Sequence, residues 1–195
     1  MNPDKRKKIL KAAITVFARN GFLQAKVEEI ASLAGVATGT TYLYFENKDD
    51  ILISIFEEEM NPIIKTVTEE MEKQQNPVDQ LTAFITQHMI MVQENPDMAY
   101  LLQVELRQSS KFIRGYSGTK FKEYLNLIAI AFKNGQQQNL FRNDISVTIF
   151  KQMLFGALDQ ISTNWILSKS KNLDLEQSAK QISDVFFKGI LTEGE

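Results

Sequence analysis

The chain has 195 residues, enough for one large or two small domains, and its apolar fraction of 44% can build a hydrophobic core. It contains no cysteine, which excludes disulfides, thiolate metal sites and thiol catalysis. No apolar run approaches the length of a membrane span, and the charged amino-terminal segment lacks the apolar stretch of a signal peptide. We therefore expect a cytoplasmic protein that does not enter a membrane.

The net charge of −2 conceals an uneven distribution along the chain. Residues 1–48 carry eight lysines and arginines against four acidic residues, a balance of +4, which leaves −6 for the remainder. A basic segment at one end of an acidic chain is typical of a protein in which only the first domain faces nucleic-acid phosphates.

The first predicted helix begins at Pro3 and ends before Gly21, because proline favours the first helical position and glycine the position after the last turn. The basic cluster Lys5–Lys8 lies in its first turns. This cluster is either a solvated helix start or a contact with backbone phosphates, which would add affinity without sequence information.

Two short helices joined by a tight turn follow. Apolar residues recur at helical spacing from Val27 to Ala34, and Gly35 then supplies the positive φ that a tight turn needs. A second helix runs from about Thr38 to Phe45. Such a pair is a helix-turn-helix, whose second helix lies in the DNA major groove; a helical hairpin within an all-α core is the alternative.

The second of these helices carries the candidate DNA-reading residues. Its first residues are small and allow close approach to base edges: Thr38, Gly39 and Thr40. Larger polar side chains that can reach flanking phosphates follow: Tyr42, Tyr44 and Lys48. Leu43, between the tyrosines, is given no role. Ala37 precedes the helix and cannot cap it with its side chain.

The run IASLAGVATGTTYLYFENKDDI resembles the DNA-binding signature of the TetR family of transcriptional regulators, with an I-A-x-x-A-G-V turn, a G-T-x-Y recognition helix and Y-F-x-x-K after it. The resemblance covers about Lys8 to Leu52. It implies an all-α protein of about nine helices, with a three-helix DNA-binding domain over 1–47 and an effector-binding and dimerisation domain over 48–195. It also implies a bacterial repressor. The residues that would contact DNA are Thr38, Gly39, Thr40, Tyr42, Tyr44, Lys48 and, in addition, Lys26.

Further helices are predicted over residues of about 48–75, 77–94, 96–108, 111–138, 145–169 and 175–190. Their starts are marked by N-cap residues: Asn47, Asn76, Asn95, Asp144 and Asp174. Pro62 predicts a kink, either purely structural or a mechanical link from the DNA-binding domain. Gly115 and Gly118 predict a break in the fourth of these helices.

The last two predicted helices carry more apolar surface than one buried face requires. We expect them to pair with the same helices of a second copy in a four-helix bundle; a large self-contained core is the alternative. The two recognition helices of such a homodimer would meet successive major grooves about 34–36 Å apart. The operator is then an inverted repeat.

His88 is the only histidine and lies on an apolar stripe of its helix. A hydrogen-bonded core histidine is the first interpretation. The alternative, an α-helical hydrolase using His88 with a nearby Ser or Asp, has no supporting nucleophile–base spacing, so we expect the protein not to be an enzyme. One histidine and scattered carboxylates do not make a metal-binding set, so we expect no metal and no cofactor.

The segments YLYFENKDDILISIF, LLQVELRQSS and MLFGALDQISTNWIL resemble the fatty-acid-degradation repressors (FadR type) of Gram-positive bacteria. This resemblance implies a long-chain acyl-coenzyme A (acyl-CoA) effector, with its tail in an apolar tunnel and its phosphates near basic groups. Arg107 and Gln108 match the E-L-R-Q-S segment and are head-group candidates; a salt bridge of Arg107 with Glu105 or Glu123 is the alternative. Tail-lining candidates, taken from stripe positions, are Phe84, Met91, Leu102, Tyr124, Phe155 and Trp165.

These features predict a ligand-responsive repressor that binds a palindromic operator as a dimer and is released by its effector. Couplings between two such sites are typically 1–3 kcal/mol, which would weaken DNA binding roughly 5- to 150-fold. The alternative effector is a hydrophobic or cationic drug with Glu105 and Asp159 as counter-charges, in a regulator of an efflux system.

Overall fold

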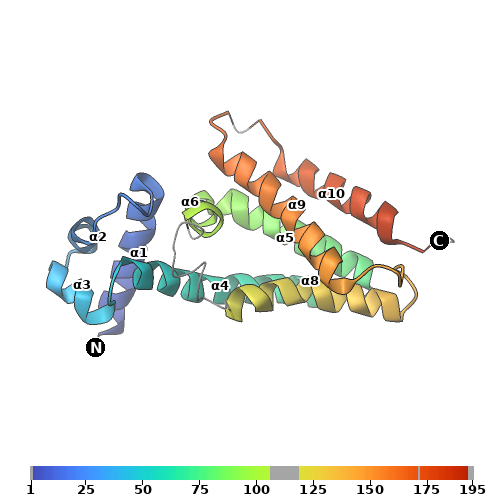
Figure 1. Cartoon of the computed structure of the whole chain (residues 1–195), viewed down its shortest axis with the longest axis horizontal. Coiled ribbons are helices and arrows are strands. Elements are labelled where there is room, and N and C mark those ends of the chain that lie inside the picture. Colours follow the sequence, from blue (N-terminus) through green and yellow to red (C-terminus); the bar gives the residue numbers. More distant parts are fainter. Residues whose placement is uncertain (1, 106–118, 171, 193–195) are drawn as a thin grey trace. The chain divides into compact units, whose positions relative to one another are not determined.

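The computed structural model describes residues 2–105, 119–170 and 172–192 (Figure 1). Over these residues the chain forms nine α-helices, one π-helical turn and no β-strand, which confirms the predicted all-α class. The elements are α1 (Pro3–Asn20), α2 (Val27–Ala34), α3 (Thr38–Tyr44), α4 (Lys48–Glu72), α5 (Pro77–Glu94), α6 (Pro96–Tyr100), η1 (Leu101–Glu105), α8 (Thr119–Gln137), α9 (Val147–Leu167) and α10 (Leu175–Ile190). None of these described helices is long and apolar enough to cross a membrane.

The chain divides into two compact units. The first contains α1, α2, α3, the part of α4 up to Met60, α6 and η1; the second contains the rest of α4 together with α5, α8, α9 and α10. α4 therefore contributes to both units, and it continues through Pro62 without interruption.

Most helix starts agree with the N-caps expected from the sequence. The Asn76 side chain accepts a hydrogen bond from the Asp79 N–H at 2.9 Å before α5. Asp174 accepts from the N–H groups of Glu176 and Gln177 before α10. These bonds satisfy donors that the first turn of a helix leaves without partners, which is why such starts can be recognised from sequence.

Two sequence-based expectations about helix limits are wrong. α9 begins after Ser146 rather than after Asp144, because the Asp144 carboxylate is held by Arg142 at 2.7 Å; this hydrogen bond lowers the pKa of Asp144 below its ordinary value. The helix expected over 96–108 ends as an α-helix at Tyr100 and continues as the π-helical η1. The predicted break at Gly115–Gly118 lies outside the described residues.

Each unit has its own hydrophobic core. In the first, fully buried side chains come from α1, α2 and α4, and include Ile9, Phe17, Ile30 and Leu52. In the second, aromatic rings dominate: the Phe132 ring stacks on Phe150 at 3.9 Å and on Phe141 at 5.4 Å between ring centroids. In this unit α5 packs against α8, α9 and α10 (Figure 1).

Candidate nucleic-acid interface and effector core

The turn between α2 and α3 has the geometry that the sequence predicted. Gly35 adopts φ 68° and ψ 35°, in the left-handed region that favours glycine. Its N–H donates to the Ser32 carbonyl at 3.1 Å, and the Val36 N–H donates to the Ala31 carbonyl at 3.0 Å. These two bonds close α2 and turn the chain directly into α3.

The residues of α3 divide into a buried side and an exposed side. Thr41 is fully buried, and Phe45, which follows the helix, is nearly so. On the other side Gly39 is exposed, and Tyr42 and Leu43 keep 50% and 72% of their surface exposed. This exposed side is the surface that a helix-turn-helix presents to DNA.

Two of the predicted phosphate contacts make internal contacts in the first unit. The Lys48 ammonium donates to the carbonyls of Leu23 and Ala25 at 2.9 and 3.0 Å and lies 4.8 Å from the centroid of the Phe22 ring. The Tyr44 hydroxyl accepts from the Asn2 N–H at 3.0 Å. Both side chains therefore hold α3 and α4 to the segments before them.

The remaining DNA-binding candidates are more accessible. Thr38 and Thr40 are half-buried at the start of α3, and Lys26 is exposed just before α2. In the basic cluster of α1, Arg6 pairs with Glu58 of α4 and stands 5.2 Å over the Phe45 ring. Arg6 thus has a structural role that the charge pattern alone did not indicate.

The second unit brings three of the predicted tail-lining residues together. Phe84, Tyr124 and Phe155 join His88 and Phe121 in what we call the aromatic cluster. The ring centroids of Phe84 and Tyr124 are 4.9 Å apart, and those of Tyr124 and Phe155 are 6.5 Å apart. Phe84 and Tyr124 are buried, whereas Phe121 and Phe155, 5.2 Å apart, are half-buried and form the outer edge of the cluster.

His88 is a hydrogen-bonded core histidine, as first interpreted. Its Nδ1 lies 2.9 Å from the Tyr124 hydroxyl and its Nε2 lies 3.2 Å from the Ser162 hydroxyl. Burial lowers the pKa of His88 to about 4 and raises that of Tyr124 above its ordinary value, so both groups are neutral near pH 7. Ser162 was missed by the sequence analysis, although it lies one turn after Leu158 on an apolar stripe, where a polar residue indicates a buried partner.

The other effector candidates within the described residues are only partly buried. Met91 and Trp165 are half-buried on α5 and α9. Leu102 is half-buried in η1 and belongs to the first unit. Arg107 and Gln108 lie outside the described residues. Glu123, the alternative partner considered for Arg107, pairs with Lys120 at 2.8 Å.

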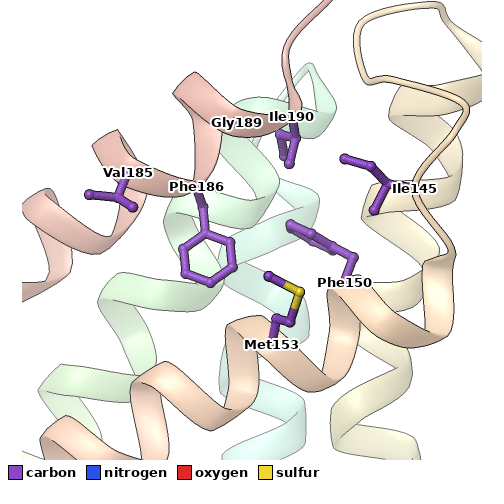
Figure 2. A pocket seen from close by; sticks show the side chains of 7 residues that line it. All are labelled: Ile145, Phe150, Met153, Val185, Phe186, Gly189 and Ile190. Carbon is purple, nitrogen blue, oxygen red and sulfur yellow. The ribbon is translucent and has the colours of Figure 1, made fainter.

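A hollow of about 200 Å³ lies between α9 and α10 (Figure 2), and none of the predicted tail-lining residues is among the residues that line it. Its lining is apolar and includes Phe150, Met153, Val185 and Phe186. Met153 and Val185 keep 58% and 67% of their surface exposed, and Ile149 on α9 keeps 54%. Apolar side chains exposed together on two neighbouring helices mark a surface that another protein can cover.

Comparisons with known families match nearly the whole chain. Residues 9–55 match the model described as bacterial regulatory proteins, tetR family, and residues 56–189 match the model described as YsiA-like protein, C-terminal region. The fatty acid metabolism regulator protein of Bacillus subtilis is 34% identical over 186 residues, which is 95% of each chain.

Two solved structures of regulators share this architecture. One is FadR from Bacillus subtilis in complex with stearoyl-CoA, with a TM-score of 0.87, 34% identity, and coverage of 94% of this chain and 98% of that one. The other is the fatty acid degradation regulator FadR from Bacillus halodurans, with a TM-score of 0.88, 34% identity, and coverage of 97% of both chains.

Proposed function

The chain belongs to the TetR family of bacterial regulatory proteins, and from this premise we propose that it is a cytoplasmic repressor that a long-chain acyl-CoA releases from its operator. The observation that carries the proposal is the similarity, at 34% identity and almost full length, to a FadR crystallised with stearoyl-CoA. The relatives are regulators, so the protein is a DNA-binding regulator and not an enzyme.

DNA recognition is assigned to residues 1–47, with α3 in the major groove. Thr38, Gly39, Thr40 and Tyr42 are the candidates for base and nearby phosphate contacts, with Lys26 at the edge. Tyr44 and Lys48 act in part by holding α3 in place, since their polar atoms bond to the protein. The exposed Leu43 is an added candidate, because an apolar side chain in the major groove can contact a thymine methyl group.

Dimerisation and effector binding are assigned to residues 48–195. The exposed Ile149, Met153 and Val185 support a homodimer through α9 and α10, with an inverted-repeat operator. The aromatic cluster supports an apolar site for the acyl tail, and the head-group assignment of Arg107 and Gln108 rests on the sequence match alone. For release, the acyl-CoA must bind better to the conformation that fits DNA less well.

The proposal is tested by selecting the operator from a random duplex pool and titrating the complex with stearoyl-CoA. The selected operator should contain one inverted repeat. Fluorescence anisotropy of the labelled operator should show that stearoyl-CoA weakens binding roughly 5- to 150-fold. Coenzyme A without an acyl chain should have no effect, since it lacks the apolar part. The Arg107→Ala variant should bind the operator normally and require more stearoyl-CoA for release.

Other outcomes identify the error. Selection of no palindromic site would refute the DNA-binding assignment. Release by cationic dyes but not by stearoyl-CoA would replace the acyl-CoA effector with that of an efflux regulator.

A further inference from the structure

A continuous chain of hydrogen bonds crosses the second unit and joins three helices. It runs from the Tyr124 hydroxyl on α8 through both ring nitrogens of His88 on α5 to the Ser162 hydroxyl on α9. The Ser162 hydroxyl also donates to the Met89 sulfur at 3.7 Å. All four side chains are at least nine-tenths buried, so each polar hydrogen needs a partner inside the protein.

The bond between Ser162 and Met89 favours one donor in each of the other hydrogen bonds. Since a methionine sulfur can only accept, the arrangement that forms every bond has Ser162 donating to Met89 and the Ser162 oxygen accepting from the Nε2–H of His88. The Nδ1 of His88 is then without a hydrogen and accepts from the Tyr124 hydroxyl. In this forward arrangement every hydrogen has an acceptor, and no donor is left for a bound ligand.

A reversed arrangement uses the same atoms and the same number of protons. The ring hydrogen of His88 moves to Nδ1 and donates to the Tyr124 oxygen, while the Ser162 hydroxyl donates to Nε2. This reversal gives up only a bond to sulfur, which is a weak acceptor. It frees the Tyr124 hydroxyl, a strong donor, to bond elsewhere. An oxygen acceptor placed beside Tyr124 therefore favours the reversed arrangement.

The surroundings of Tyr124 define which acceptor that is. The rings of Phe84 and Phe155 lie 4.9 and 6.5 Å from the Tyr124 ring between centroids, so the hydroxyl of Tyr124 has apolar neighbours. In a long-chain acyl-CoA the carbonyl of the thioester is the first polar atom next to the apolar tail, and it accepts hydrogen bonds but cannot donate them. This chemistry matches the single donor that the reversed chain supplies.

We infer that Tyr124 donates a hydrogen bond to the thioester carbonyl of the effector, and that His88 and Ser162 reverse their hydrogen bonds when it binds. The inference rests on the proposed function, since it concerns the acyl-CoA of that same site. Tyr124 is the contact residue, and His88 and Ser162 act through it as positioning residues.

The first test compares stearoyl-CoA with S-octadecyl-CoA, a thioether that keeps the tail and the coenzyme but lacks the carbonyl. Isothermal titration should show that Tyr124→Phe weakens stearoyl-CoA binding about three- to tenfold, the usual effect of one hydrogen bond. The same variant should bind the thioether as the wild type does, which also shows that it is folded. Ile130→Ala, on the exposed side of α8 and outside this hydrogen-bond chain, is the control and should keep the wild-type preference for the thioester.

The second test uses the fact that His88 is the only histidine in the chain. Nitrogen-15 histidine labelling then gives one imidazole signal set, whose shifts report which nitrogen carries the hydrogen. The free protein should carry it on Nε2, stearoyl-CoA should move it to Nδ1, and the thioether should leave it on Nε2.

The outcomes separate this inference from the proposed function. If stearoyl-CoA binds the wild type but Tyr124→Phe changes both ligands equally or neither, the inference is overturned and the proposed function stands. The inference is likewise overturned if the His88 tautomer does not change when stearoyl-CoA is added. If neither stearoyl-CoA nor the thioether binds the wild type, both this inference and the proposed acyl-CoA effector are refuted.

Discussion

Gly39 is a residue whose small size the proposed DNA contact requires and the fold does not. It is exposed near the start of α3, and a Cβ built on it meets no atom within 4 Å. The fold therefore does not require glycine at this position. A small residue here fits the close approach of α3 to DNA that we propose.

Gly39→Ala should raise the melting temperature slightly and weaken operator binding. Alanine is favoured over glycine in a helix by about 0.5–1 kcal/mol, while the new methyl group would occupy space against the bases. Thermal melting and operator anisotropy measure the two effects. Operator affinity equal to that of the wild type would remove Gly39 from the interface.

His88 should make the stability of the second unit depend on pH. Its pKa is about 4 when folded and near 6.5 in the unfolded chain, so the unfolded chain binds the extra proton between these values. The contribution of neutral His88 to the free energy of unfolding is therefore fully present above pH 6.5 and is lost as the pH falls toward 4. Urea unfolding, followed by the fluorescence of the single tryptophan, Trp165, should lose about 1 kcal/mol between pH 7 and pH 5.5.

His88→Gln is the matched control for this pH dependence. Glu59, whose pKa is raised by burial, titrates in both proteins, so their difference isolates His88. An unchanged pH dependence in the variant would contradict the burial of a neutral imidazole.

At the scale of elements, the loop between α8 and α9 is hydrogen-bonded to the end of α10. The Arg142 N–H donates to the Ile190 carbonyl at 2.8 Å, and its guanidinium donates to the Gly189 carbonyl at 3.0 Å. Phe141 forms an isolated antiparallel bridge with Leu191. The loop can close this tightly because the Phe141 ring lies directly over Gly135 of α8.

Gly135→Ala should destabilise the protein by about 1–3 kcal/mol, the usual cost of overpacking. A Cβ there would come within 2.0 Å of the Phe141 ring, and that ring cannot move easily because it is buried and stacked on Phe132. Urea unfolding measures the loss. The same substitution at Gly39 is the control, and equal effects at both sites would contradict the packing argument.

At the scale of the whole molecule, the proposed homodimer depends on the exposed apolar side chains of α9 and α10. Val185→Asp should yield a monomer in sedimentation velocity, because it would place a charge without a partner in the interface. Operator affinity should fall about 100-fold or more, since the two recognition helices would no longer bind as one unit.

Ile130→Asp provides the comparison for this test. Ile130 lies on α8 and is 59% exposed, close to the 67% of Val185. This variant should remain a dimer and bind the operator normally. A dimeric Val185→Asp protein would move the interface away from α10.

The sequence by itself determined the all-α class, most helix starts and the turn at Gly35. These features depend on groups a few residues apart: a cap and its N–H, a glycine and its own φ, an apolar stripe on one helix. The expectation at Asp144 failed because Arg142, whose guanidinium also bonds to Gly189 of a distant helix, draws the carboxylate away from its cap position.

Only the tertiary structure decided which polar groups of distant residues, in side chains or backbone, meet. Tyr44 with Asn2, Lys48 with Leu23, and His88 with Ser162 are separated by 42, 25 and 74 residues. No local pattern encodes such pairs, because they form only when packing brings separate helices together. The same packing places Phe84, Tyr124 and Phe155 side by side, where the sequence could identify each only as a member of its own apolar stripe.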